Sequence, residues 1–157
     1  MFCFQCQETA HGTGCTVQGV CGKKARTSAY MDVLIAIVRS VGVVAELTET
    51  YGDVEQDGRK HGNVGEFIVN ALFSTITNAN FDDDSLRERI MRGVVLRDAL
   101  VEVAKRKELI VPDYVEFELP CGDEDCKLGD NGEQDDACGD ERLRRTDDEP
   151  RVLHAVC

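Results

Sequence analysis

The chain has 157 residues, 42% of them apolar, which is enough for one ordinary domain with a hydrophobic core but leaves little room for a second. Its formal net charge is −12, from 30 acidic and 18 basic side chains. Such an excess repels phosphate backbones and anionic lipid headgroups, so neither nucleic acid nor a membrane is expected as a partner.

The first segment, residues 1–27, is rich in cysteine and glycine and shows neither helical nor strand periodicity. Its cysteines have the spacing Cys-x2-Cys-x8-Cys-x5-Cys. They are Cys3, Cys6, Cys15 and Cys21. Because the segment is too short to bury a core of its own, we expect a loop that is organised around a bound group.

Two thiols separated by two residues can bind one metal centre from a single turn, and the longer arms let the chain fold back to complete the ligand shell. The glycines between them permit positive φ angles and close approach of backbone N–H groups to sulfur. Structural zinc usually uses two close cysteine pairs, and only Cys3 and Cys6 form one here. The spacing favours an iron–sulfur cluster and leaves open zinc, unligated cysteines or disulfides.

The N-terminus has no basic stretch followed by an apolar one, so we expect no secretory signal and a cytoplasmic protein. Eight cysteines in a reducing compartment argue for metal binding or catalysis rather than disulfides. The most apolar stretch, from Met31 to Leu47, contains Arg39 and Glu46 and is predicted to be too short and too polar to span a bilayer. We therefore expect it in the core.

Residues 28–110 are predicted to form three helices with short connections, which suggests an antiparallel bundle. In the first helix, apolar residues recur at helical spacing between Ser28 and Thr50. Ser28 is its candidate N-cap. The stretch "YGDVEQDGRKHGNVG" then interrupts the pattern with four glycines, as expected of a surface connection.

The second helix is predicted from about Gly65 to Ala79, where apolar residues again lie on one stripe. The third is predicted to begin at residues 82–84, three aspartates that can cap free amides and suit the positive end of a helix dipole. It should end at the basic run 105–107, since cations suit the opposite end.

Residues 111–157 are predicted to form an acidic, largely irregular tail. From Glu118 to Cys157 there are 13 Asp and Glu against 5 Lys and Arg, with few large apolar residues, a composition typical of disorder. The start of the tail alternates weakly and could be extended, with Pro112 and Pro120 limiting any helix. The spacing of its cysteines fits no metal motif, so we expect exposed thiols at Cys121, Cys126, Cys138 and Cys157.

The opening "MFCFQCQETAHGTGCTVQGVCGK" closely resembles that of the hybrid-cluster proteins, also called prismane proteins, a family of hydroxylamine reductases. A second stretch, "FIVNALFSTITNANFD", falls at the matching distance downstream, and the resemblance covers roughly residues 1–109. It implies an N-terminal helical domain and a [4Fe–4S] cluster. The ligands that it implies are Cys3, Cys6, Cys15 and Cys21.

Members of that family are several times longer than this chain and reduce hydroxylamine to ammonia at a second, mixed iron–sulfur–oxygen cluster in their later domains. Those domains have no counterpart here, so we expect this chain to lack the hybrid cluster and any catalytic residue of its own. The resemblance implies an N-terminal electron-transfer module, whether a fragment, a truncated product or half of a split protein. Its partners would be a redox donor protein and, in a split protein, catalytic domains on a separate chain.

The sequence also fits two other functions. One is a stand-alone iron–sulfur electron carrier, which would use the same cluster without a catalytic partner. The other is a zinc-stabilised interaction module with no redox activity. Iron in the cysteine loop separates the first from the second.

Overall fold

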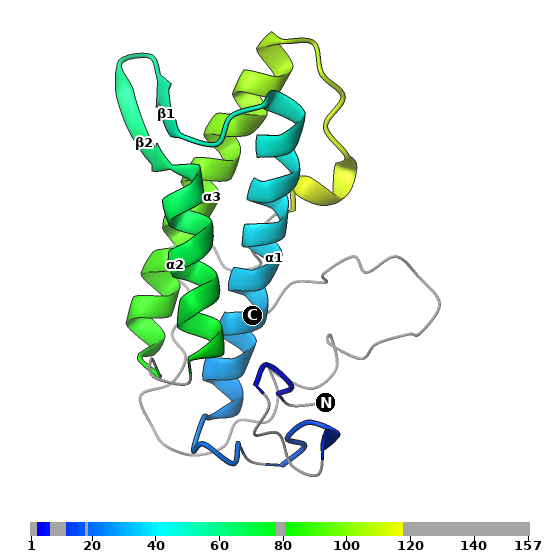
Figure 1. The fold of residues 1–157 in the computed structure, drawn as a ribbon, viewed down its shortest axis with the longest axis vertical. Coiled ribbons are helices and arrows are strands. Elements are labelled where there is room, and N and C mark those ends of the chain that lie inside the picture. The colour runs from blue at the N-terminus through cyan, green and yellow to red at the C-terminus, as the bar shows by residue number, and fades with distance from the viewer. Residues whose placement is uncertain (1–2, 7–11, 18, 78–80, 118–157) are drawn as a thin grey trace. The chain divides into compact units, whose positions relative to one another are not determined.

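The computed structural model describes residues 3–6, 12–17, 19–77 and 81–117. In these residues the chain forms three α-helices, a two-stranded hairpin between the first and second, and a short 3₁₀ helix after the third (Figure 1). This confirms the expected mainly α class. The predicted tail beyond residue 117 and its four cysteines lie outside the described residues, and the division at residues 27 and 110 stays a prediction.

The first helix, α1, spans Ala25–Thr48 and packs against both other helices and the 3₁₀ helix. It starts earlier than predicted, because its N-cap is Lys24, whereas Ser28 is buried inside the helix. The reason is a tertiary contact. The Thr27 hydroxyl donates a hydrogen bond of 2.7 Å to the carboxylate of Asp83 on the third helix, which holds the first turn without a side-chain cap.

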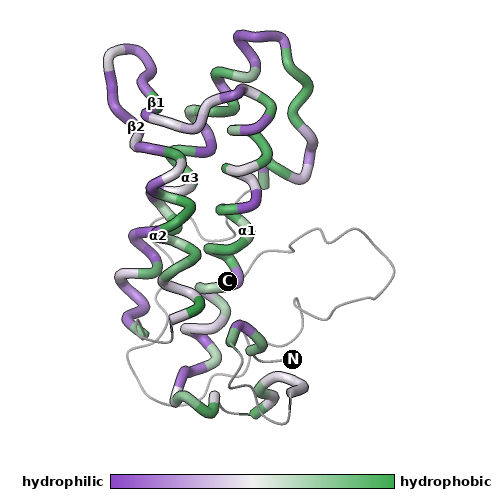
Figure 2. The backbone as a smooth tube through the Cα atoms, in the orientation of Figure 1, coloured by the Kyte–Doolittle hydropathy of each residue, from purple (hydrophilic) through white to green (hydrophobic). Residues whose placement is uncertain are grey.

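By length and composition alone α1 could cross a membrane, with a mean hydropathy of 1.7 over its most apolar window. The extension to Ala25 makes it longer than the stretch Met31–Leu47 that we judged too short and too polar. A core helix of a soluble protein passes the same test, and 61% of the window is buried here. The expected core position is thus confirmed, and Figure 2 shows hydrophobic residues recurring along the helices.

The connection after α1 is a hairpin. Strand β1, Asp53–Gln56, pairs antiparallel with β2, Arg59–Asn63. Asp57 and Gly58 join them with φ angles of 52° and 73°, the two positive values that a tight hairpin turn requires. The stretch is therefore more ordered than the surface connection we predicted. The sequence does not show the alternation of apolar and polar residues that predicts a strand, because Val54 is the one buried residue in the two strands.

Helix α2 spans Val64–Ile76 and begins with a side-chain cap, since Asn63 Oδ1 accepts a hydrogen bond of 3.0 Å from the Glu66 backbone amide. The predicted range from Gly65 is correct at its start. Its predicted end at Ala79 falls among residues 78–80, outside the described residues.

Helix α3 spans Asp83–Arg106 and confirms both predicted ends. The Asp82 carboxylate accepts a hydrogen bond of 3.1 Å from the Asp84 amide, and Lys107 forms the C-cap. Successive helices run in opposite directions, so α1 and α3 are parallel (Figure 1). Lys107 Nζ also donates a hydrogen bond of 2.7 Å to the Thr48 carbonyl, which joins the ends of α1 and α3.

The core lies between α1 and α3, which pack together more extensively than any other described pair of elements. Its fully buried apolar residues include Met31, Leu34, Ile37, Val41, Leu86, Leu96 and Leu100. All three helices approach one another at Gly93. A Cβ there would lie 2.4 Å from Ile37 Cγ2 and 2.5 Å from Phe67 Cζ, so the absence of a side chain permits this packing.

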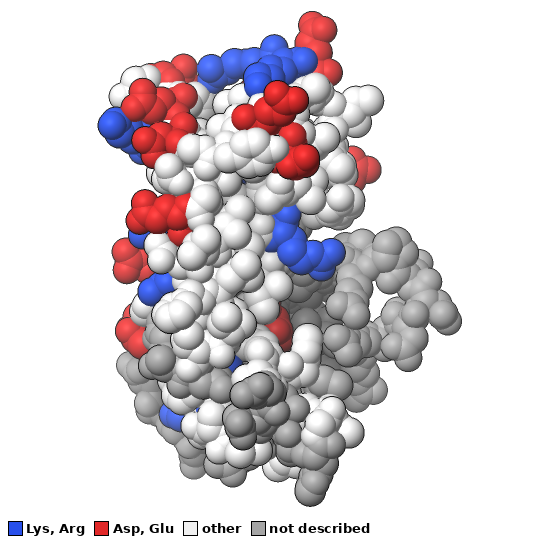
Figure 3. All heavy atoms as spheres, in the orientation of Figure 1, with Lys and Arg blue, Asp and Glu red and all other residues white. Residues whose placement is uncertain are grey.

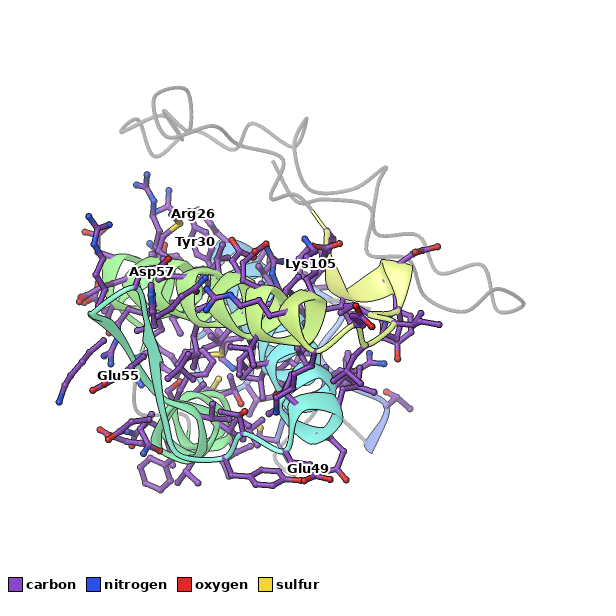
Figure 4. All side chains as sticks on the ribbon, turned by 90° about the horizontal axis from the view of Figure 1, so that it is seen from above. Arg26, Tyr30, Glu49, Glu55, Asp57 and Lys105 are labelled. Carbon is purple, nitrogen blue, oxygen red and sulfur yellow. The ribbon has the colours of Figure 1, made fainter. Side chains whose placement is uncertain are left out.

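After α3 the chain forms the 3₁₀ helix Asp113–Val115, preceded by Pro112. The extended conformation that we considered for this stretch is therefore wrong over these residues. Buried Val115 fixes the segment to α1, and Lys105 Nζ lies 3.0 Å from a Glu116 carboxylate oxygen. That hydrogen bond raises the pKa of Lys105 above its usual 10.5. Figure 4 shows Lys105 near this segment.

Candidate functional site

Two of the four predicted ligand cysteines face each other across an isolated antiparallel bridge. The Cys3 amide donates to the Cys15 carbonyl at 2.9 Å, and the Cys15 amide donates to the Cys3 carbonyl at 2.7 Å. Both residues are buried, with 6% and 5% of their surface exposed. Of the other two predicted ligands, Cys6 is half-buried and Cys21 is exposed. The bridge therefore pairs Cys3 with Cys15, which lies farther along the chain than Cys6, its partner in the Cys-x2-Cys pair.

Glycines shape the loop at the places where the backbone must turn. Gly14, directly before Cys15, has a φ of 90°, and Gly22, directly after Cys21, has a φ of 86°. Residues with a Cβ rarely adopt such angles. Of the glycines that lie between the cysteines, Gly12 and Gly14 take the positive φ values that the sequence predicted.

A turn places the residue after Gly22 inside the protein. The Gly22 amide donates a hydrogen bond of 2.9 Å to the Gly19 carbonyl, and a Cβ on Gly19 would lie 2.9 Å from the Lys23 carbonyl oxygen. Lys23 follows this turn and is buried, with 2% of its surface exposed. Its neighbour Lys24 is exposed.

Lys23 meets the cysteine loop at its buried end. Its Nζ lies 3.9 Å from Cys3 Sγ and donates a hydrogen bond of 3.0 Å to Gln5 Oε1. Gln5 Nε2 in turn donates a hydrogen bond of 2.9 Å to Asp32 Oδ1 on α1. Lys23 is not among the predicted site residues, because nothing in "CGKK" distinguishes the buried lysine from the exposed one.

The start of α1, next to the loop, is joined to α3 by Asp83. Arg26 Nε lies 2.7 Å from Asp83 Oδ2, and this hydrogen bond raises the pKa of the Arg26 guanidinium. The second oxygen of the same carboxylate accepts from Thr27. The loop is thus attached to a helix end that is held from two sides.

A family model described as Prismane/CO dehydrogenase family matches residues 1–155. This chain belongs to that family. The predicted resemblance to the prismane proteins is thereby confirmed.

Curated relatives of this prismane-family chain are named hydroxylamine reductase. Those of Methanocella arvoryzae, Bacteroides fragilis and Desulfitobacterium hafniense are 49%, 46% and 44% identical to it over 100 residues. The aligned region covers 64% of this chain and 17% of each relative. The chain therefore matches about a sixth of the length of these relatives.

The residues of the prismane-family loop fit a metal–thiolate group in their chemistry. Four thiols are available as soft ligands, and none forms a disulfide with another described cysteine. Lys23 places a buried positive charge beside one of them, which suits a group that carries net negative charge.

The structure does not gather the four cysteines around one point. Among the described residues, no three His, Cys, Asp or Glu side chains come together as a metal-ligating group. Cys3 and Cys15 are adjacent, whereas Cys6 and Cys21 lie closer to the surface. The assignment of all four as ligands stays a prediction.

Proposed function

We propose that this chain is the N-terminal electron-transfer module of an iron–sulfur oxidoreductase of the hydroxylamine reductase type. The observation that carries the proposal is the cysteine loop of a prismane-family chain, in which two buried cysteines are paired beside a buried cation. In this proposal a [4Fe–4S] cluster is held by Cys3, Cys6, Cys15 and Cys21. When bound, such a cluster supplies single-electron transfer.

The residues of this chain would position the cluster and exclude water from part of it. Burial of Cys3 and Cys15 removes one side of the loop from solvent, and the Gln5 to Asp32 hydrogen bond attaches that side to α1. Solvent exclusion and hydrogen bonding near the sulfurs are general determinants of cluster potential. The loop would thus set the energy at which an electron is accepted.

Reduction of hydroxylamine breaks its N–O bond and consumes two electrons and two protons, giving ammonia and water. We place that chemistry outside this segment, in the part of the relatives that the segment does not match, with no hybrid cluster and no catalytic residue here. The 17% coverage of the relatives supports this division. Cytoplasmic location is part of the proposal, because ligand thiols must remain reduced.

An apolar strip on α2 supports a protein partner. Its members recur at helical spacing and are exposed: Val69, Leu72, Phe73 and Ile76. Figure 3 shows that the face formed by α1 and α2 is largely uncharged, whereas charged side chains gather at the hairpin end of the bundle. Contiguous exposed apolar surface is typical of interaction sites. We propose a redox donor protein or, for a split enzyme, the catalytic domains as its partner.

Anaerobic purification followed by iron, sulfide and zinc analysis tests the cluster. We expect about four iron atoms per chain and a broad visible absorption that dithionite bleaches. Stoichiometric zinc without iron would refute the proposal and support the interaction module instead. If iron is present, co-purification of a catalytic polypeptide separates a split enzyme from a stand-alone electron carrier.

Two cysteine variants test the ligand assignment. Cys6→Ala should lose the cluster, because three thiolates leave one iron without its protein ligand. Cys126→Ala removes a cysteine from the tail and serves as the control that keeps its iron. Full iron content in Cys6→Ala, or loss of iron in Cys126→Ala, would show that the ligand set is wrong.

A further inference from the structure

Lys23 is a buried cation next to the cysteine loop and is not one of the proposed cluster ligands. Lysine is among the residues least often fully buried, because removing its ammonium from water is costly unless polar groups replace the lost hydration. Here 2% of the residue is exposed. Within the described part of the chain its polar contacts are a carbonyl oxygen and a sulfur rather than a carboxylate.

The hydrogen bonds of Lys23 join three parts of the chain. Gln5 Oε1 accepts a hydrogen bond of 3.0 Å from Lys23, so Nε2 of the same side chain faces the other way and donates to Asp32 at 2.9 Å. An ammonium can only donate and a carboxylate can only accept, so their two charges fix the orientation of the amide between them. The cysteine loop, the turn before α1 and α1 itself are thereby connected.

The Lys23 ammonium lies between the cysteine loop and an aromatic ring. Cys3 Sγ lies 3.9 Å from Nζ, and the ring centroid of Phe81 lies 5.9 Å from it. The face of an aromatic ring attracts a cation and shields it from water. The Lys23 ammonium therefore contacts both Cys3 Sγ, a predicted ligand sulfur, and Gln5, the anchor whose hydrogen bond to Asp32 attaches the loop to α1.

We propose that Lys23 is a positioning residue of the cysteine loop. Its ammonium holds Cys3 and Gln5 against α1 and places a positive charge beside the ligand sulfur. The electrostatic part of this inference rests on the proposed cluster, whereas the anchoring part applies to the cluster-free chain as well. Each part has its own test.

In the cluster-loaded protein, Lys23→Met should make the reduction potential more negative. A positive charge next to a ligand stabilises the reduced, more negative state, and methionine fills similar space without charge. We expect the reduced form to become about tenfold less favoured, which corresponds to a shift of about 59 mV for a one-electron couple. Lys24→Met removes the same charge from the exposed neighbour and should leave the potential unchanged.

Lys23→Arg keeps the charge and should keep the potential closer to that of the wild type than Lys23→Met does. Gln5→Ala removes the anchor but keeps the cation, so it should shift the potential less than Lys23→Met. A potential in Lys23→Met equal to that in Lys24→Met would overturn the electrostatic role of Lys23.

In the cluster-free protein, hydrogen exchange of the Cys3 and Cys15 amides measures how firmly the loop is held. Lys23→Met and Gln5→Ala should each speed this exchange about tenfold relative to Lys24→Met, with circular dichroism confirming that the helices persist. Unchanged exchange in both variants would overturn the anchoring role. If the wild-type protein binds no iron, the proposed function is refuted. The anchoring inference still holds in that case if Lys23→Met and Gln5→Ala exchange faster than Lys24→Met.

Discussion

Gly93→Ala tests the idea that the helices pack as closely as they do because position 93 has no side chain. In an open helix the change would stabilise the fold, since alanine is favoured over glycine by about 1 kcal/mol. Here the new methyl group would lie 2.4 Å from Ile37 Cγ2 and 2.5 Å from Phe67 Cζ. Both distances are about 1 Å shorter than ordinary van der Waals contact.

The contact with Ile37 decides the sign. Phe67 is half-buried and its contacting atom is the far end of a ring, which can move, but Ile37 is fully buried between α1 and α3. Overpacking at such a site costs about 1–3 kcal/mol, and we expect the upper part of that range. After the gain in helix propensity, Gly93→Ala should lower the free energy of unfolding by about 2 kcal/mol.

Urea unfolding followed by circular dichroism measures this difference. Gly42→Ala is the matched control, because Gly42 also lies within a helix but has no atom within 4 Å of its added Cβ. That control should gain up to about 1 kcal/mol. In an Ile37→Ala background, the cost of Gly93→Ala should shrink, since the clashing methyl group is gone. A Gly93→Ala protein as stable as Gly42→Ala would refute the reasoning.

Three further predictions concern the cap of α2, the contact between α1 and α3 at Asp83, and the hydrogen bond between Tyr51 and Glu46. Asn63→Ala removes the α2 cap and should cost about 1 kcal/mol in urea unfolding; no loss would show that the cap is not needed. Asp83→Ala leaves the buried Thr27 hydroxyl without its acceptor and should cost about 1–2 kcal/mol by the same assay, whereas an unchanged midpoint would contradict the contact between α1 and α3. The Tyr51 hydroxyl donates a hydrogen bond of 2.7 Å to Glu46, and this bond raises the pKa of Tyr51 above 10.0. The contact therefore stabilises the fold below pH 10, and the stabilisation is lost as the pH rises through the raised pKa. With the other tyrosines replaced by phenylalanine, the phenolate absorbance should titrate at lower pH in Glu46→Ala than in its parent, and identical titration curves would contradict this contact.

Local chemistry was enough to predict several features of this protein. The aspartates at 82–84 and the basic residues at 105–107 mark the ends of α3 because capping and helix dipoles act within one turn. Helical spacing of apolar residues located all three helices for the same reason. The cysteine spacing and the resemblance it carries identified the family, since these depend on the order of residues alone.

Other features depended on contacts between distant residues. The start of α1 was misplaced because Asp83, 56 residues from Thr27, provides the acceptor that holds the first turn. The cysteine spacing pointed to Cys3 and Cys6 as the close pair, whereas the backbone bridge joins Cys3 to Cys15. Both contacts bring together residues that no local pattern relates.

The residue beside the cysteines shows the same division most clearly. Lys23 and Lys24 have identical chemistry and adjacent positions, so the sequence by itself determined only that two cations follow the last of the four predicted ligand cysteines. Tertiary structure decided that Lys23 is buried against Cys3 and Gln5 while Lys24 faces solvent. The physical reason is that Lys23, which follows the turn at Gly19 and Gly22, finds polar partners in Cys3 and Gln5 and lies over the ring face of Phe81.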